Sequence, residues 1–152
     1  MLFGLATCAL TRRQVESLDV LQRRMLRSIV GWVRVPDEPW DDTMRRMRHK
    51  VARATSIFPI PTWTSQLARH KFGPAGSFMQ KAADWPARAI RWDPSSTHPY
   101  AHRGRGRPQR RWDDDLALFA TTHFPGQRWF HAASDPAQWN AREDAFVASM
   151  TA

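Results

Sequence analysis

The length, composition and charge of this chain are those of one basic, folded domain. Its 152 residues are 42% hydrophobic and 24% charged, which excludes a disordered chain. The formal net charge of +9 and the pI of about 11.3 favour a polyanionic partner, of which nucleic acid is the commonest. The lone cysteine, Cys8, excludes an internal disulfide and a cysteine-rich zinc site.

The positive charge is concentrated before residue 112. Residues 1–111 carry 21 basic and 8 acidic side chains, whereas residues 112–152 carry 2 basic and 6 acidic ones. Most of the basic residues are arginines, whose planar forks bind phosphates through paired hydrogen bonds and stack on bases. This distribution indicates binding to nucleic acid or to an anionic membrane surface.

The apolar start of the chain does not predict a membrane segment. The first ten residues are mostly apolar, but a bilayer span needs about twice that length. No positive charge precedes them, which argues against a signal peptide. We therefore expect no membrane insertion and a nuclear or cytoplasmic protein.

Two long helices are predicted in the first sixty residues. Apolar residues at steps of three and four predict a helix over residues 11–30, with Thr11 as its N-cap and Gly31 at its end. A second such pattern predicts a helix over residues 40–57. Arginines occupy the other faces of both. The two apolar stripes are Val15, Leu18, Leu21, Met25 and Ile29, and then Trp40, Met44, Met47, Val51 and Ala54.

Shorter helices are predicted further along. We expect one over residues 63–72 that stops at Gly73 and Pro74, and residues 75–83 fit another. Prolines break residues 84–100. Residues 112–123 fit a helix, and a last helix begins at Asp135 as N-cap. No strand pattern is convincing, so the predicted fold is all-α, a small irregular bundle of four to six helices.

An extended arm interrupts this helical pattern. Two glycines and a proline prevent residues 103–111 from forming an ordinary helix. The segment holds five arginines and no acid: Arg103, Arg105, Arg107, Arg110 and Arg111. Residues 105–108 have the form of an AT-hook core, which lies in the minor groove of A·T-rich DNA. The alternative is a solvated basic linker. The predicted organisation is thus a basic helical domain (1–94), a basic arm (95–111) and a C-terminal helical segment (112–152).

The remaining chemistry-bearing residues favour structural roles. Asp113, Asp114 and Asp115 could hold magnesium, but they precede an apolar helical pattern. We expect them to stabilise the helix dipole and to pair with nearby arginines. The histidines lack ligand spacing, and no nucleophile or phosphate-loop motif occurs. The sequence therefore predicts no catalytic residue, metal site or cofactor. Tryptophans on apolar stripes favour the core, with base stacking as the alternative.

Three segments carry a family resemblance. Residues 18–31 read LDVLQRRMLRSIVG, residues 63–77 contain LARHKF, and residues 105–116 read RGRPQRRWDDDL. In this order they resemble the C-terminal region of non-LTR (LINE-like) retrotransposon reverse transcriptases, with its "LQRR-LR-ILG" helix, "LR-GH-R" helix and "RGRP-RRW-DD" element. The resemblance covers residues 3–120. The second segment departs from it, because Gly76-Ser77 replaces the family's Gly-His.

The resemblance implies a thumb-like and post-thumb piece that grips template, primer or target DNA without catalysis. The family's polymerase palm, with its aspartate pair on a β-hairpin, and its endonuclease domain have no counterpart in this sequence. We expect the five arm arginines to contact phosphates, with Arg23, Arg24 and Arg27 extending the track. The expected partners are RNA, DNA or a hybrid, and the remainder of a reverse transcriptase. A helical protein-interaction module with a solubilising arm, a standalone enzyme and a decayed open reading frame remain alternatives.

Overall fold

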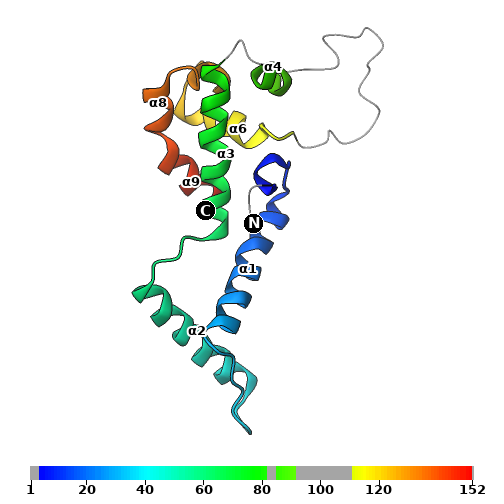
Figure 1. The fold of residues 1–152 in the computed structure, drawn as a ribbon, viewed down its shortest axis with the longest axis vertical. Coiled ribbons are helices and arrows are strands. Elements are labelled where there is room, and N and C mark those ends of the chain that lie inside the picture. The colour runs from blue at the N-terminus through cyan, green and yellow to red at the C-terminus, as the bar shows by residue number, and fades with distance from the viewer. Residues whose placement is uncertain (1–3, 82–84, 92–110, 152) are drawn as a thin grey trace, which may run out of the picture.

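The chain is all-α, as expected. The computed structural model describes residues 4–81, 85–91 and 111–151, which are helical without strands (Figure 1). These described residues form eight α-helices, more than the four to six expected; six of them have seven residues or more, and α7 and α8 are shorter. The elements are η1 (Leu5–Thr7), α1 (Arg12–Ile29), α2 (Trp40–Ile57), α3 (Trp63–Gln80), α4 (Trp85–Arg91), α6 (Asp114–His123), α7 (Trp129–Ala132), α8 (Pro136–Asn140) and α9 (Glu143–Thr151).

The first two helices have the predicted bounds. The Thr11 side chain accepts a hydrogen bond from the Gln14 backbone N–H, and the Gln14 side chain accepts one from the Thr11 N–H, at 3.3 and 2.8 Å. This capping box satisfies two of the donors that a helix start leaves unpaired. Gly31, with φ of +80°, follows the end of α1 in the left-handed conformation that glycine favours. The second helix runs over Trp40–Ile57, as predicted.

The predicted stop at Gly73 and Pro74 is wrong, because α3 continues through both residues to Gln80. Pro74 faces solvent, whereas Phe72 before it and Met79 after it are buried in the same core. A proline inside a helix costs about 3 kcal/mol. Burying one continuous apolar stripe on both sides of the proline offsets that cost.

The main core joins α3 to the C-terminal helices. Phe72 of α3 stacks on Trp139 of α8 with 4.1 Å between ring centroids, and Phe146 of α9 lies 5.0 Å from Phe72. Phe119 of α6 meets Phe72 edge-on at 6.0 Å. Residues 112–152, expected as a separate segment, therefore share their core with α3.

The single last helix expected after Asp135 is divided into α8 and α9. Asp135 caps α8 as predicted, since its side chain accepts hydrogen bonds from the backbone of residues 137 and 138. A new helix starts at Glu143, where Glu143 and Asp144 lie in the first turn and both pair with Arg69 of α3, at 3.2 and 2.8 Å. Acids in a first turn are favoured by the helix dipole, and Arg69 holds this start against α3.

The part formed by α1 and α2 projects from this bundle (Figure 1). One of its attachments to α3 is made by Gln22, a buried side chain of α1. The Gln22 amide donates to the Pro61 carbonyl at 2.9 Å and accepts from the Trp63 N–H at 2.8 Å. The start of α3 is thereby fixed to the middle of α1, while α2 packs mainly against α1.

Candidate nucleic-acid interface

Most of the predicted arm lies outside the described residues. This applies to Arg103, Arg105, Arg107 and Arg110. Arg111 is described and exposed, with its Nε 3.5 Å from Asp113 Oδ1. Its backbone N–H donates to the Asp114 carboxylate at 2.7 Å. The end of the arm is thus anchored at the start of α6.

The three aspartates after the arm are occupied within the protein. Asp113 accepts a hydrogen bond from Trp129 Nε1 at 3.0 Å in addition to its contact with Arg111. Asp114 and Asp115 lie in the first turn of α6, as predicted. Asp115 pairs with buried Lys71 of α3 at 2.7 Å, whereas Asp113 contacts one of the expected arginines, Arg111.

Of the three α1 arginines expected to contact phosphates, two line a surface hollow. Arg24 and Arg27 face it, whereas Arg23 is exposed on α1 but does not line it. The hollow has a volume of about 650 Å³. Its walls come from α1, from the loop between α1 and α2, and from the start of α2. The lining residues are Arg24, Arg27, Ser28, Trp32, Arg34, Trp40 and Met44.

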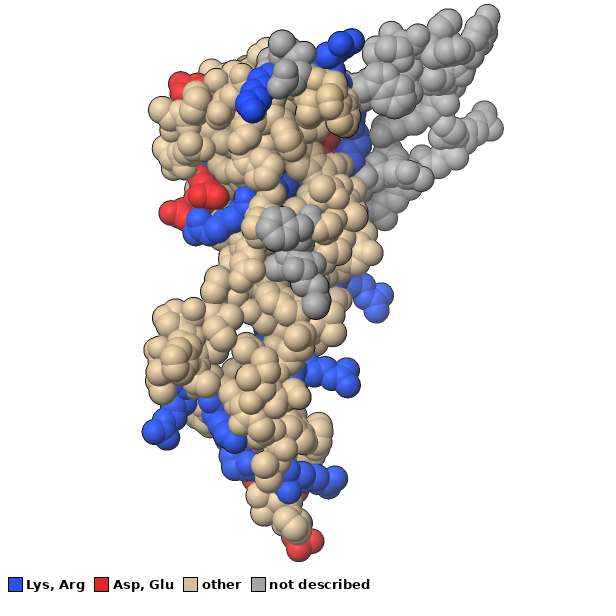
Figure 2. Space-filling view, in the orientation of Figure 1, with Lys and Arg blue, Asp and Glu red and all other residues tan. Residues whose placement is uncertain are grey.

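The cations of this hollow are not neutralised locally. Among the described residues, the side chains of Arg24, Arg27 and Arg34 form no ion pair or hydrogen bond. Residues 20–36 contain four arginines and no acid. Figure 2 shows basic side chains projecting at several points from the part built by α1 and α2. An unneutralised group of arginines produces the positive potential that attracts polyanions.

The loop between α1 and α2 is held by other basic residues. The Arg46 guanidinium binds both carboxylate oxygens of Glu38, at 3.0 and 2.7 Å, and donates to the Val33 carbonyl at 2.8 Å. Thr43 Oγ1 also donates to Glu38, and Lys50 donates to the Gly31 carbonyl at 3.2 Å. The hydrogen bonds from Arg46 and then Thr43 lower the pKa of Glu38 from 4.5 to about 2.

Two tryptophans of the hollow are exposed, so the expectation that stripe tryptophans are buried is wrong for Trp40. Trp32 and Trp40 are 40% and 57% exposed, with ring centroids 5.8 Å apart and planes tilted by 52°. Trp139, on the apolar side of the predicted last helix, is buried as that expectation required, and Trp129 is buried as well. Trp40 is more exposed than Trp139 because α2 packs mainly against α1, and none of the described helices covers Trp40 from the other side.

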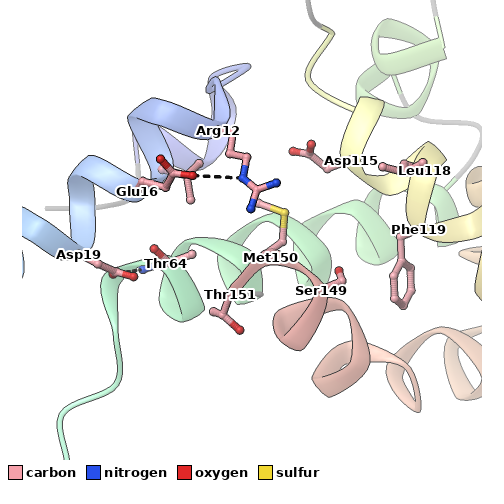
Figure 3. A pocket seen from close by; sticks show the side chains of 11 residues that line it. Arg12, Glu16, Asp19, Thr64, Asp115, Leu118, Phe119, Ser149, Met150 and Thr151 are labelled. Atoms are coloured by element: carbon pink, nitrogen blue, oxygen red, sulfur yellow. Dashed lines mark hydrogen bonds and ion pairs between the residues drawn. The ribbon is translucent and has the colours of Figure 1, made fainter.

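A second hollow lies between α1, α3, α6 and α9 (Figure 3). Its charged side chains already have partners, since Arg12 pairs with Glu16 at 3.1 Å and Asp19 accepts from the Thr64 N–H at 3.2 Å. The buried Thr64 hydroxyl lacks a hydrogen-bond partner among the described residues. These charged side chains are therefore already engaged in contacts within the protein.

Comparisons with protein-family models, curated proteins and solved structures give no match to the chain. Within the described parts of the chain, no three acidic, histidine or cysteine side chains are grouped as a metal ion would require. None of the helices described is both long enough and apolar enough to cross a membrane.

Arg34 and Trp32 were not predicted from the sequence as members of a site. Both lie in a loop that the helical patterns leave unassigned. One feature of the sequence points to them. The stretch of residues 20–36 has four arginines and no acid, and it extends past the predicted helix end at Gly31 to include Trp32 and Arg34.

Proposed function

We propose that this chain binds nucleic acid without catalysing a reaction, as a C-terminal piece of a retrotransposon reverse transcriptase. The observation that carries the proposal is the convergence of Arg24, Arg27 and Arg34 on one hollow without a neutralising acid among the described residues. Guanidinium forks bind phosphate oxygens through paired hydrogen bonds, and buried or paired arginines cannot do so. In this proposal Arg23 and the arm arginines extend the same phosphate track.

The link to reverse transcriptases rests on the three sequence segments. The first of them supplies the basic surface of α1 together with Gln22, which attaches α1 to α3. The third supplies the arm and its anchor at Asp113 and Asp114. The partners would be RNA, DNA or a hybrid, and the remainder of the polymerase, in the nucleus or cytoplasm.

Equilibrium binding by the full chain tests the proposal. Fluorescence anisotropy with labelled 20-mers of single-stranded RNA, single-stranded DNA, duplex and hybrid should give binding that weakens strongly between about 50 and 200 mM salt. The variant Arg24→Ser/Arg27→Ser/Arg34→Ser should bind about tenfold or more weakly. The variant with Arg103, Arg105, Arg107, Arg110 and Arg111 all changed to Ser should lose affinity similarly.

A control with the same loss of charge separates contact from net charge. Arg12→Ser/Arg128→Ser/Arg142→Ser removes three cations that do not line the hollow. This control should bind within about twofold of the unaltered chain, since distant exposed charges are screened. If none of the four nucleic acids binds at low salt, or if the hollow variant and the control lose affinity equally, the proposal is wrong.

One observation favours a protein-interaction module as the second candidate. On α1, the side chains of Leu21, Met25 and Ile29 are exposed, the last at 75%, although they form the predicted apolar stripe. Uncovered apolar stripes mark surfaces that bind protein. Nucleic-acid binding by the unaltered chain discriminates the two functions, and Met25→Ser/Ile29→Ser tests whether the stripe takes part in that binding. A role in nucleic-acid binding alone predicts unchanged affinity, and a purely protein-binding module predicts no nucleic-acid affinity to begin with.

A further inference from the structure

We infer that the hollow between α1 and α2 accepts an unpaired base, so that the preferred ligand is single-stranded nucleic acid. This inference rests on the proposed function and adds the form of the ligand. It starts from Trp32 and Trp40, whose rings are tilted by 52° and not stacked face to face. Their exposed fractions of 40% and 57% leave ring surface available to a ligand.

The surroundings of these rings match a stacking site. Arg24 and Arg27 lie three residues apart on α1 and therefore on one face of the helix, and Arg34 approaches from the loop. Aromatic side chains that stack on bases, combined with cations that follow the backbone, are the common arrangement in proteins that bind single strands. A purely apolar partner would not require three unneutralised arginines around the rings, and the charge favours a polyanion.

A double helix does not fit this arrangement. Its bases are stacked on one another, and exposing one face requires unstacking and unpairing. The hollow volume of about 650 Å³ lies within the range of pockets that hold small organic groups. An unpaired base can therefore enter while the neighbouring phosphates meet the arginines at its rim.

The site is prepared before binding. The Glu38 carboxylate receives hydrogen bonds from Arg46 and Thr43, and Lys50 holds the Gly31 carbonyl. These contacts fix both ends of the loop that carries Trp32 and Arg34. A loop that is already ordered loses less conformational entropy when the ligand binds.

Fluorescence of 2-aminopurine, placed in the middle of a single-stranded DNA 12-mer, tests the inference with the full chain. Stacking on an indole quenches this base. We expect quenching on binding, and about tenfold weaker binding to a blunt duplex of the same length and sequence. Trp40→Ala and Trp32→Ala should each abolish most of the quenching and weaken single-strand binding about tenfold, with duplex binding unchanged.

Two further variants make the result specific. Trp40→Phe keeps an aromatic face and should retain most of the quenching. Phe58→Ala removes an aromatic that is 70% exposed at the other end of α2 and should change nothing. Because Trp32 and Trp40 are exposed, their replacement should leave the helical circular dichroism signal unchanged.

The outcomes separate the two proposals. If Trp40→Ala and Trp32→Ala bind and quench like the unaltered chain while the triple arginine variant loses affinity, the base site is wrong and the phosphate-binding function stands. Equal affinity for single strand and duplex also overturns the base site. If neither ligand binds at low salt, both proposals fail.

Discussion

Gly76 of α3 lies directly against the indole of Trp139. A Cβ atom at residue 76 would lie 2.6 Å from Cδ1 and 2.8 Å from Nε1 of that indole. The indole has little freedom to withdraw, because it stacks on Phe72 and its Nε1 donates to the Phe72 carbonyl at 3.1 Å. Gly76, in the segment where the resemblance departs, therefore permits the close packing of α3 against α8.

Gly76→Ala should destabilise the protein by overfilling this contact. We expect the free energy of unfolding, measured by urea titration, to fall by about 1–3 kcal/mol. Gly73→Ala, in the same helix, is the matched control. Apart from its neighbours in the chain and the backbone of its own helix, a Cβ atom at residue 73 would meet no atom within 4 Å. That control should change stability by less than about 1 kcal/mol, because the better helix propensity of alanine is offset by crowding of its Cβ against Cδ of Pro74. Equal stability of the two variants would contradict the packing role.

Replacing only one partner of the ion pair between Lys71 and Asp115 should lower the stability of the protein more than replacing both. Both side chains are nearly buried, and the Lys71 ammonium lies 5.4 Å from the centre of the Trp112 ring. Asp115→Ala should cost about 3–5 kcal/mol, because it leaves a buried cation. In a double-mutant cycle completed by Lys71→Met, the double variant Lys71→Met/Asp115→Ala should recover much of that loss. Additive losses in the double variant would show that the two residues are not coupled.

Gln22 should behave as a structural residue despite its position beside Arg23 and Arg24. Gln22→Ala leaves the Pro61 carbonyl and the Trp63 N–H without their partner. An unpaired buried group costs about 1–3 kcal/mol, and chemical denaturation should show a loss of that order. Gln22→Glu keeps an acceptor for Trp63 but sets a buried carboxylate oxygen against the Pro61 carbonyl, so it should also lose stability. Wild-type stability of Gln22→Ala would rule out this attachment.

Acid should weaken the loop between α1 and α2 through Glu38. The pKa of Glu38 is about 2 in the folded protein because of hydrogen bonds from Arg46 and Thr43, below the ordinary 4.5. Glu38 therefore binds a proton more tightly in the unfolded chain than in the folded one. The stability that the Glu38 carboxylate contributes is complete above pH 4.5 and is lost as the pH falls towards 2. Thermal unfolding against pH should show a smaller acid loss for Glu38→Gln than for the unaltered chain. Asp37→Asn, a neighbouring control, should keep the full acid loss, and identical profiles for all three proteins would contradict the role of Glu38.

Local signals were sufficient where the neighbouring residues alone determine the structure. The cap at Thr11, the left-handed Gly31 and the cap at Asp135 each depend on side chains within a few positions of the helix end. The all-α class also follows, because helical spacing of apolar residues recurs through the described helices.

Interactions between distant segments decided what local signals could not. The cost of Pro74 is local, but the burial that outweighs it comes from α6, α8 and α9. Trp40 fits an apolar stripe, yet its exposure depends on whether another layer covers α2. The hollow could not be predicted, because only the folded loop brings Trp32 and Arg34 beside α1 and Trp40.

The central claim is that arginines of this chain neutralise a nucleic-acid backbone. The dependence of binding affinity on salt concentration tests this claim most directly. For duplex DNA, a plot of log K against log salt should be linear, with a slope of about −0.9 for each phosphate neutralised. Changing the arm arginines to Ser should make the slope shallower by about 0.9 for each phosphate that the chain then leaves unneutralised. The residues changed are Arg103, Arg105, Arg107, Arg110 and Arg111. The same slope before and after this change would contradict the account.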